Sequence, residues 1–370
     1  MTMHNLRILF VHPDLTYFGG AEKVLVHMIH ALKEHNLSLL SSWWDPHFIG
    51  KQIGEYEIPK IQWIKCPPFL LKYKRLRAFQ WIKYSNNINK IVQNLKEDYD
   101  IIIETQQVYI TPQSNAVLIN YLHYPYLIIP PPEADNLIIR LYYSIQRRIL
   151  LKRFKRINLM LTNSPFTANI IRNNLGTEPI VVYPPVDVQK FNSEKDWRER
   201  EDKVINIGTF IPFKRQIILL EIARLLPKIK FVLIGWLENR DSKYFQNIIN
   251  NKPENVEVLH NVPDDTLVKE LMTSKAYVHL CPEHFGISVI EAIAAGCAPI
   301  VYHLGGPIEI LGNSALSWSN PRELANSIER VVNDEILWRN TIKNAKSKLF
   351  QFKSSIFEQK IRDIIKSYNA

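Results

Sequence analysis

Short runs of apolar residues alternate with longer amphipathic stretches along most of the chain. The runs are continuously apolar, which is typical of parallel strands buried on both faces, and the stretches between them have helical periodicity. In the first half, the predicted strands are Arg7–Val11, Leu37–Ser42, Ile61–Ile64, Asp100–Glu104, Val117–Leu122 and Leu159–Asn163. In the second half, they are Val204–Gly208, Phe231–Gly235, Val256–Leu259, Ala276–Leu280, Ala298–Tyr302 and Ala315–Ser317.

Two such series predict two doubly wound α/β domains, each built on a parallel sheet. The break between them falls near Tyr183–Asp187, where two prolines end a strand, and the charged run Glu194–Lys203 follows. We expect an N-terminal domain of residues 1–187 and a C-terminal domain of residues 188–349. The last helical segment, about residues 350–370, is expected to join the first domain.

The composition is that of an ordinary globular protein, with 370 residues, 46% of them hydrophobic and 22% charged. No apolar run approaches the roughly 20 residues of a membrane-spanning helix, and the N-terminus has no cleavable signal. Cys66, Cys281 and Cys297 are widely spaced, so their pattern indicates neither a disulfide framework nor a zinc site. A reducing, cytoplasmic compartment fits this composition.

The net charge of +10 favours an acidic partner. Basic residues mix with aromatic and apolar ones in residues 69–83 and 141–156, a composition that suits an interface with anionic lipid. The alternative is a helix with an apolar core face and a basic solvent face, which is favoured for 141–156 and left open for 69–83. A nucleic-acid partner is not expected, because no nucleic-acid motif accompanies the charge.

The most informative motif runs from Glu283 to Glu291, where two carboxylates bracket a glycine turn at the start of a predicted helix that ends before Gly296. Gly286 lets a ligand approach the backbone, and the helix N-terminus can receive a phosphate. Carboxylates accept hydrogen bonds from sugar hydroxyls. The motif therefore predicts a nucleotide-sugar site, although either glutamate also fits a solvated surface charge.

Other candidate residues follow predicted strands, at the sheet edge where ligands of such folds bind. Gly19 and Gly20 precede a helix, where they allow backbone approach and leave N–H groups available, or make only a turn. His123 follows the strand 117–122 and suits either a structural or a functional role. Lys214 and Arg215 are placed to neutralise a diphosphate, or are a solvated pair.

Taken together, these residues resemble the retaining GT-B glycosyltransferases of family 4. The Glu283–Glu291 element matches the paired-glutamate motif of that family. The segments 121–125 (YLHYP), 182–187 (VYPPVD) and 284–287 (HFGI) resemble the mannosyltransferases that extend lipid-pyrophosphate-linked N-glycan precursors on the cytoplasmic membrane face. The resemblance covers the chain from His12 to about Ile310.

The resemblance implies roles for individual residues. Glu283 holds hydroxyls of the transferred sugar, Glu291 holds the ribose, and Val262 lies near the base. The implied catalytic set is His123, Lys214 and Glu283. The implied donor-binding set is Gly19, Gly20, Arg215, Val262, Phe285, Gly286, Ile287 and Glu291.

One loop departs from the family pattern, because Thr209 and Ile211 stand where an arginine usually precedes Lys214. Either Arg215 replaces that arginine or the diphosphate is neutralised less well.

The resemblance further implies that a hexose moves, with retention, from a GDP- or UDP-sugar to a lipid-linked glycan. The acceptor attacks from the leaving-group face, so Glu283 is not assigned as a nucleophile. Asp98-Tyr99-Asp100 precedes a strand rather than following one, so we expect no metal and no other cofactor. The alternatives are a sugar-nucleotide epimerase of the same architecture and a non-catalytic scaffold that binds nucleotide or lipid.

Overall fold

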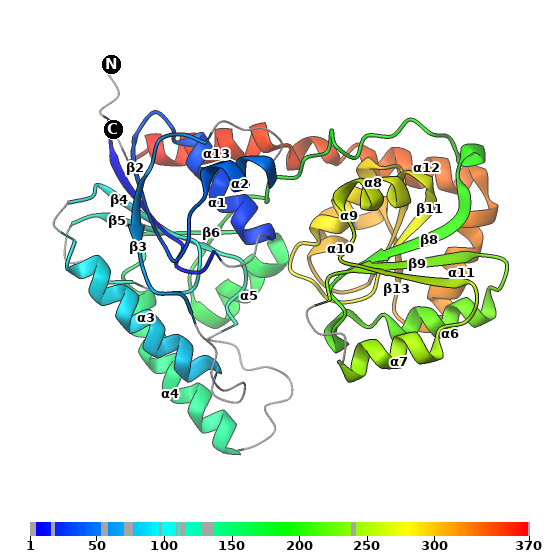
Figure 1. The fold of residues 1–370 in the computed structure, drawn as a ribbon, viewed down its shortest axis with the longest axis horizontal. Coiled ribbons are helices and arrows are strands. Elements are labelled where there is room, and N and C mark those ends of the chain that lie inside the picture. Colours follow the sequence, from blue (N-terminus) through cyan, green and yellow to red (C-terminus); the bar gives the residue numbers. More distant parts are fainter. Residues whose placement is uncertain are drawn as a thin grey trace. The chain divides into compact units, whose positions relative to one another are not determined.

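The computed structural model describes residues 5–15, 19–52, 58–69, 77–95, 98–108, 110–111, 115–126, 137–237 and 242–368. The chain divides into two compact units, and both are α/β (Figure 1). Unit 1 comprises Met1–Pro185 and Ser354–Ala370, and unit 2 comprises Val186–Lys353. The boundaries expected from the sequence lie within a few residues of these positions.

The described part of unit 1 contains a seven-stranded sheet in which all pairings are parallel, in the order β3-β2-β1-β4-β5-β6-β7. After β1 the chain adds β2 and β3 on one side of the sheet and then returns to add β4 to β7 on the other side. Ligands of open α/β sheets bind at such a switch in strand order, which here lies between β1 and β4. The strands are β1 (Arg7–Val11), β2 (Asn36–Ser41), β3 (Gln62–Lys65), β4 (Ile101–Glu104), β5 (Val117–Leu122), β6 (Leu159–Thr162) and β7 (Ile180–Val181).

Helices cover both faces of this sheet. They are α1 (Gly20–Ala31), α2 (Pro46–Gln52), α3 (Arg77–Gln93), α4 (Leu137–Phe154), α5 (Pro165–Leu175) and α13 (Ser354–Lys366). Along β1, Ile8 and Phe10 pack with α1 and α13, whereas Leu9 and Val11 pack with α3. A strand buried on both faces is apolar at every position, which explains the continuous runs in the sequence.

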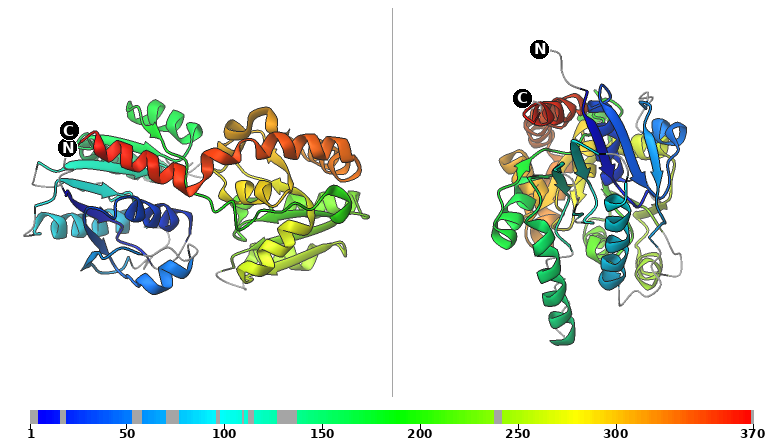
Figure 2. Two further views of the ribbon diagram at one scale, coloured as in Figure 1. Left: turned by 90° about the horizontal axis from the view of Figure 1, so that it is seen from above. Right: turned by 90° about the vertical axis from the view of Figure 1, so that its left-hand side faces the viewer.

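The C-terminal helix α13 returns to unit 1 and packs against α1 (Figure 2). Phe357 and Ile361 enter the same core as α1, and both are almost fully buried. At this contact, the carboxylate of Glu358 accepts hydrogen bonds from His27 Nδ1 at 2.9 Å and His30 Nδ1 at 3.0 Å. The structure therefore joins the last helix to the first unit, as expected.

The described part of unit 2 contains a six-stranded parallel sheet in the order β10-β9-β8-β11-β12-β13, with its switch in strand order between β8 and β11. The strands are β8 (Glu201–Ile207), β9 (Lys230–Gly235), β10 (Val256–His260), β11 (Ser274–His279), β12 (Ala298–Tyr302) and β13 (Leu316–Trp318). The helices are α6 (Ile217–Leu225), α7 (Lys243–Asn251), α8 (Asp264–Thr273), α9 (Ile287–Ala294), α10 (Gly306–Leu311), α11 (Pro321–Asn333) and α12 (Glu335–Lys346).

The twelve predicted strands are all present, with ends shifted by up to three residues. The short strand β7, Ile180–Val181, was not predicted, because two residues show no periodicity. None of the helices in the described ranges is both long and apolar enough to span a bilayer.

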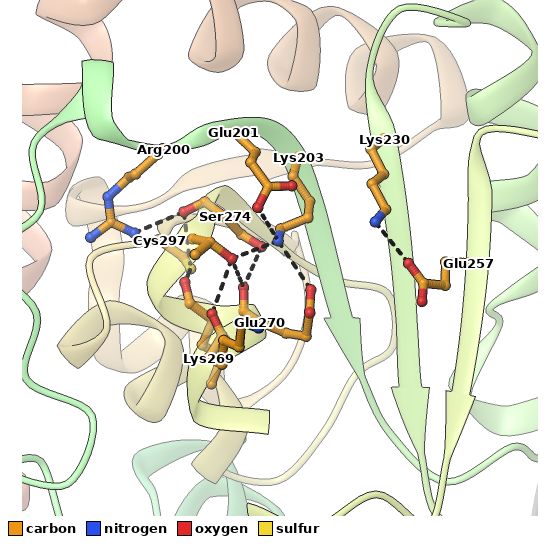
Figure 3. Close-up of polar contacts among 11 residues, drawn as sticks. Arg200, Glu201, Lys203, Lys230, Glu257, Lys269, Glu270, Ser274 and Cys297 are labelled. Carbon is orange, nitrogen blue, oxygen red and sulfur yellow. Dashed lines mark hydrogen bonds and ion pairs between the residues drawn. The ribbon is translucent and has the colours of Figure 1, made fainter. Parts of the chain in front are cut away.

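A network of buried charges ties the amino ends of β8 and β11 together (Figure 3). The Arg200 guanidinium donates to the Ser274 carbonyl at 2.9 Å and to the Ala295 carbonyl at 2.8 Å. Lys203, almost wholly buried, lies 3.0 Å from the Glu270 carboxylate. The charged run Glu194–Lys203 follows the domain break, as predicted, and its end lies in the interior of unit 2.

Candidate active site

The turn between β11 and α9 carries the predicted glutamate motif, and its backbone explains its glycines. Gly286 has φ +85° and caps α9, whose first residue is Ile287. A Cβ at Gly286 would lie 2.8 Å from Pro307 Cγ, and one at Gly306 would lie 2.0 Å from the His284 carbonyl oxygen. The turns before α9 and α10 thus pack too closely for larger residues, which fixes where the turn presents its side chains.

Glu283 lies at the centre of a charged group in this turn. Its Oε1 forms an ion pair with Lys214, and its Oε2 lies 3.3 Å from His279 Nε2. Lys214 comes from the loop after β8, and His279 ends β11, so the two strands at the switch in strand order supply the group. The Glu283 side chain is 21% exposed and that of Lys214 is 17% exposed. Both side chains are therefore partly buried and paired with each other.

Burial sets the protonation of the partners of Glu283. It lowers the pKa of Lys214, and it lowers the pKa of His279 to about 3, with a further decrease from the Lys214 charge. His279 is consequently neutral near pH 7, and the carboxylate of Glu283 is shared between one ammonium and one neutral ring. A carboxylate held in this way keeps lone pairs for the hydroxyls of a ligand.

Glu291 lies inside α9 and is buried, as expected for a residue that serves a ligand or a neighbour rather than bulk water. Near the start of the same helix, Ser288 Oγ lies 2.8 Å from the Tyr277 hydroxyl. Burial raises the pKa of Tyr277, so its hydroxyl stays protonated. These contacts hold α9 against β11.

The remaining predicted donor residues of unit 2 lie along the same edge of the sheet or in its core. Arg215 has φ 55° and places its guanidinium 5.0 Å from the Tyr302 ring centroid. Val262 follows β10, two strand positions from β8, and is half-buried. Phe285 is almost fully buried, with its ring centroid 5.7 Å from that of Phe352. Its side chain is therefore part of the core of unit 2.

A second polar group lies in unit 1, where β1, β4 and β5 end. His12 Nδ1 lies 2.7 Å from Thr105 Oγ1, and His12 Nε2 lies 3.4 Å from Glu22 Oε1. Burial lowers the pKa of His123 to about 4, while the nearby Glu22 charge opposes this. His123 Nε2 is buried and has no hydrogen-bond partner within the described ranges. The structure thus brings His123 together with two residues that the sequence analysis did not select.

Glu22 also changes the expectation for the Gly19-Gly20 turn. The Gly19 N–H donates to Glu22 Oε2 at 2.8 Å, so this N–H is not available to a ligand in the structure. Burial raises the pKa of Glu22, but the hydrogen bond with His12 and the His12 charge outweigh it, and the net shift is downward. A glutamate three residues after a helix cap is a known capping pattern, and it was the available clue to Glu22.

The two predicted basic segments, 69–83 and 141–156, differ in how far their apolar side chains are buried. Residues 70–76, with Lys72, Lys74 and Arg75, lie outside the described residues. Phe69 and Trp81 are half-buried, their rings pack at 4.9 Å, and the Trp81 indole donates to the Gln107 carbonyl. In α4, by contrast, apolar side chains are exposed: Leu141 (62%), Ile145 (54%) and Ile149 (42%). The alternative favoured for 141–156, an apolar face turned to the core, is wrong for these three residues but correct for Leu150 and Phe154, which are buried in the core.

Asp98 and Asp100 are exposed, and the Asp100 carboxylate accepts from the Arg7 N–H at 2.7 Å, before β4 begins. This pair is a helix–strand junction, as predicted, and not part of either polar group.

Comparisons with known proteins decide what kind of domain carries the Glu283 motif. The family model described as Glycosyl transferases group 1 matches residues 187–348, almost the whole of unit 2. Unit 2 is a group 1 glycosyltransferase domain. This confirms the resemblance seen in the sequence.

Curated relatives extend the similarity. The chain is 32% identical over 174 residues to the mouse GDP-Man:Man(3)GlcNAc(2)-PP-Dol alpha-1,2-mannosyltransferase, which covers 40% of this chain and 35% of that protein. It thus matches about a third of the length of that relative. It is 24% identical to the alpha-1,3/1,6-mannosyltransferase ALG2 of Dictyostelium discoideum over 98% of each chain.

Solved structures show the same two-unit architecture. The sucrose-phosphate synthase of Thermosynechococcus elongatus has a TM-score of 0.77 at 15% identity, over 98% of each chain. The Anabaena protein Alr3699/HepE, solved with UDP and glucose, has a TM-score of 0.71 at 17% identity, over 98% of this chain and 100% of that one. The predicted GT-B fold, with two parallel-sheet α/β domains, is confirmed.

Proposed function

We propose that this protein is a retaining hexosyltransferase that moves mannose or another hexose from a nucleoside-diphosphate sugar to a lipid-linked oligosaccharide. The group 1 domain and the printed activities of the relatives, which are mannosyltransferases, support transfer rather than epimerisation. GDP-mannose appears in the name of the first relatives, so it is the first donor to test.

The observation that carries this proposal is the contact of Glu283 with both Lys214 and His279 at the start of α9. In a nucleotide sugar, hydroxyls and diphosphate oxygens are neighbours across the anomeric bond. A carboxylate and an ammonium in contact match these two chemistries: the carboxylate accepts from hydroxyls, and the ammonium binds phosphate. The helix N-terminus beside them adds a favourable site for negative charge.

The same residues suit the chemistry of transfer. As the sugar–phosphate bond breaks, negative charge grows on the departing diphosphate, and fixed positive groups lower the barrier by stabilising it. Lys214 is held by Glu283, and Arg215 lies against Tyr302, so both are oriented before the donor arrives. In this scheme Glu283 is a binding group and not a nucleophile, and Arg215 takes the place of the missing loop arginine.

In unit 1, His123 is proposed to act near the transferred sugar. Because burial keeps its ring neutral near pH 7, it offers one hydrogen-bond donor and one acceptor to hydroxyls. Glu22 and His12 lie close enough to influence it, and they are proposed to orient it.

The acceptor lipid is proposed to be reached from a membrane surface, on the cytoplasmic side, through α4. Leu141, Ile145 and Ile149 are spaced by four residues and so form one exposed apolar stripe. Arg147 and Arg148 are exposed on the same helix, which suits anionic headgroups. Figure 2 shows α4 extending away from the sheet of its unit. Phe69 and Trp81 are half-buried and pack against each other, so the proposal is based on α4.

A donor panel tests the proposed function. UDP- and GDP-sugars are first ranked by thermal shift, since a ligand of the native state stabilises it by mass action. The best donor is then incubated with and without a lipid-linked glycan, and three products are measured: transferred sugar, free sugar and epimerised donor. Transfer that requires the acceptor supports the proposal. Epimerised donor, or binding without any product, supports one of the two alternatives.

Glu283→Ala is the matched loss-of-function variant. We expect transfer to collapse in it while the thermal unfolding profile persists, and near-normal turnover would remove Glu283 from the site. Glu257→Ala is the control, because Glu257 forms an exposed surface pair with Lys230 and takes no part in the site.

A further inference from the structure

Three side chains that ligate metals meet in the turn that follows β11. His279, Cys281 and Glu283 are alternate residues, and one ligand atom from each lies within 4.8 Å of the others. His279 Nε2 lies 3.3 Å from Glu283 Oε2 and 4.0 Å from Cys281 Sγ. In the described part of the chain, no other three His, Cys, Asp or Glu side chains have this arrangement.

The distances suit a tetrahedral zinc-class ion. With bonds of about 2.0 Å to nitrogen and oxygen and 2.3 Å to sulfur, the nitrogen, oxygen and sulfur ligand atoms of a tetrahedral ion lie roughly 3.3–3.5 Å apart. The nitrogen–oxygen distance of 3.3 Å is within this range, and the sulfur at 4.0 Å from nitrogen needs only a small inward shift. A thiolate with an imidazole selects soft or borderline ions over magnesium and calcium, which prefer oxygen.

The surroundings leave such an ion one way in. His279 and Cys281 are almost fully buried, whereas Glu283 is partly exposed and forms the open side of the group. Lys214 pairs with Oε1 of Glu283, and His279 faces Oε2, so an ion on Oε2 and the ammonium on Oε1 use different oxygens. On binding, the Cys281 thiol releases its proton to water, and its negative charge offsets part of the charge of the ion.

We propose that His279, Cys281 and Glu283 bind one zinc-class divalent cation, with water as the fourth ligand, and that this ion inhibits transfer. Inhibition follows because the ion takes the carboxylate oxygen that a sugar hydroxyl would use. The inhibition rests on the proposed function, whereas the binding of the ion does not. An inhibitory ion is compatible with a transfer reaction that itself needs no metal.

Cobalt(II) is the direct probe, because a thiolate bound to cobalt gives a charge-transfer absorption that oxygen and nitrogen ligands do not. Full-length protein is titrated with cobalt and then with zinc. We expect the absorption to appear at one equivalent and to disappear when zinc displaces cobalt. Cys281→Ala is expected to lose the absorption, and Glu283→Gln to weaken cobalt binding by at least about tenfold.

Cys66→Ala is the matched control, since Cys66 is also a buried free thiol but lies in unit 1. It is expected to keep the full absorption. Circular dichroism verifies that each variant is folded, and Glu283→Gln preserves side-chain size if Cys281→Ala is unstable. The proposal is overturned if wild-type protein shows no thiolate absorption, or if Cys281→Ala retains it.

A second arm measures transfer with zinc and with magnesium. Zinc is expected to inhibit and to raise the apparent KM for the donor, and magnesium is expected to do neither. If cobalt binds as described but no donor supports transfer, the proposed function fails and the metal site stands. If transfer proceeds and zinc binds without inhibiting it, the inhibitory role is overturned.

Discussion

Replacing Gly286 with alanine tests whether the backbone of the α9 turn is what positions the site. Alanine pays about 1–2 kcal/mol to adopt the left-handed conformation that Gly286 has at φ +85°. Its Cβ would also lie 2.8 Å from Pro307 Cγ and 3.2 Å from Val289 Cγ2, and overpacking of this kind costs about 1–3 kcal/mol. Unit 2 should therefore lose roughly 2–5 kcal/mol of unfolding free energy.

Alanine substitutions at two other glycines distinguish the effect of backbone strain from the effect of the position beside the site. Gly176 has φ +65°, and a Cβ added there would have no atom within 4 Å. Gly176→Ala should therefore lower the unfolding free energy of unit 1 by only about 1–2 kcal/mol. Gly296 has φ +87° at the other end of α9, and a Cβ added there would clash with the Arg200 guanidinium, away from the Glu283 group. Gly296→Ala should destabilise unit 2 much as Gly286→Ala does, without a comparable effect on the donor.

Denaturant unfolding and donor titration calorimetry supply the readouts. Gly286→Ala is expected to weaken donor binding in protein that is still folded, and Gly296→Ala and Gly176→Ala are expected to leave it nearly unchanged. Equal loss of donor affinity in Gly286→Ala and Gly296→Ala would refute the reasoning, because it would reduce the effect to general stability. The reasoning would also be refuted if Gly286→Ala lowered the unfolding free energy by no more than Gly176→Ala does.

Other perturbations address separate parts of the account. Lys214→Met should lower kcat by about 10²–10³-fold, the usual effect of removing one group that stabilises developing negative charge, and unchanged turnover would contradict its role. Excess EDTA should leave transfer intact; abolition by EDTA with recovery on adding magnesium would show a required metal. Ile145→Glu in the exposed stripe should weaken binding to anionic vesicles in a flotation assay without altering the melting temperature, and undiminished flotation would remove α4 from the interface. Burial raises the pKa of Glu358, but hydrogen bonds from His27 and His30 outweigh this, and the net shift is downward. The ionised Glu358 therefore stabilises the folded state above the ordinary carboxyl pKa, and this stabilisation is lost as the pH falls below that value. Glu358→Gln should reduce the loss of unfolding free energy on acidification, measured by urea unfolding. An unchanged dependence on pH would exclude the contact of Glu358 with His27 and His30 as its source.

The sequence predicted the two sheets because their strands are buried on both faces and hence continuously apolar. It also placed Gly286 and Gly296 correctly at the two ends of α9, because backbone conformations at φ > 0 favour glycine strongly. The pairing of Lys214 with Glu283 was not predicted. The two residues are 69 positions apart, and only the strand order, with β8 beside β11, brings them together.

Residues whose role depends on three-dimensional neighbours were missed for the same reason. His12, Glu22 and Thr105 are far apart in the sequence or carry no motif, and only the meeting of the ends of β1 and β4 brings them together. The spacing of the cysteines compares them only with one another, so it could not indicate that Cys281 lies beside His279 and Glu283. Arg200 and Lys203 belong to the charged run Glu194–Lys203, yet both are buried, which the pattern of charges alone does not indicate.

The central claim is that the Glu283 carboxylate holds the sugar part of the donor, and comparing two ligands tests it directly. Affinities for the sugar nucleotide and for the matching nucleoside diphosphate are measured by titration calorimetry in wild type and Glu283→Gln. Hydrogen bonds to a charged group contribute about 1.5–3 kcal/mol, so Glu283→Gln should weaken sugar-nucleotide binding by roughly tenfold or more. Its affinity for the nucleoside diphosphate should not weaken. If both ligands lose affinity equally, or neither does, Glu283 does not hold the sugar.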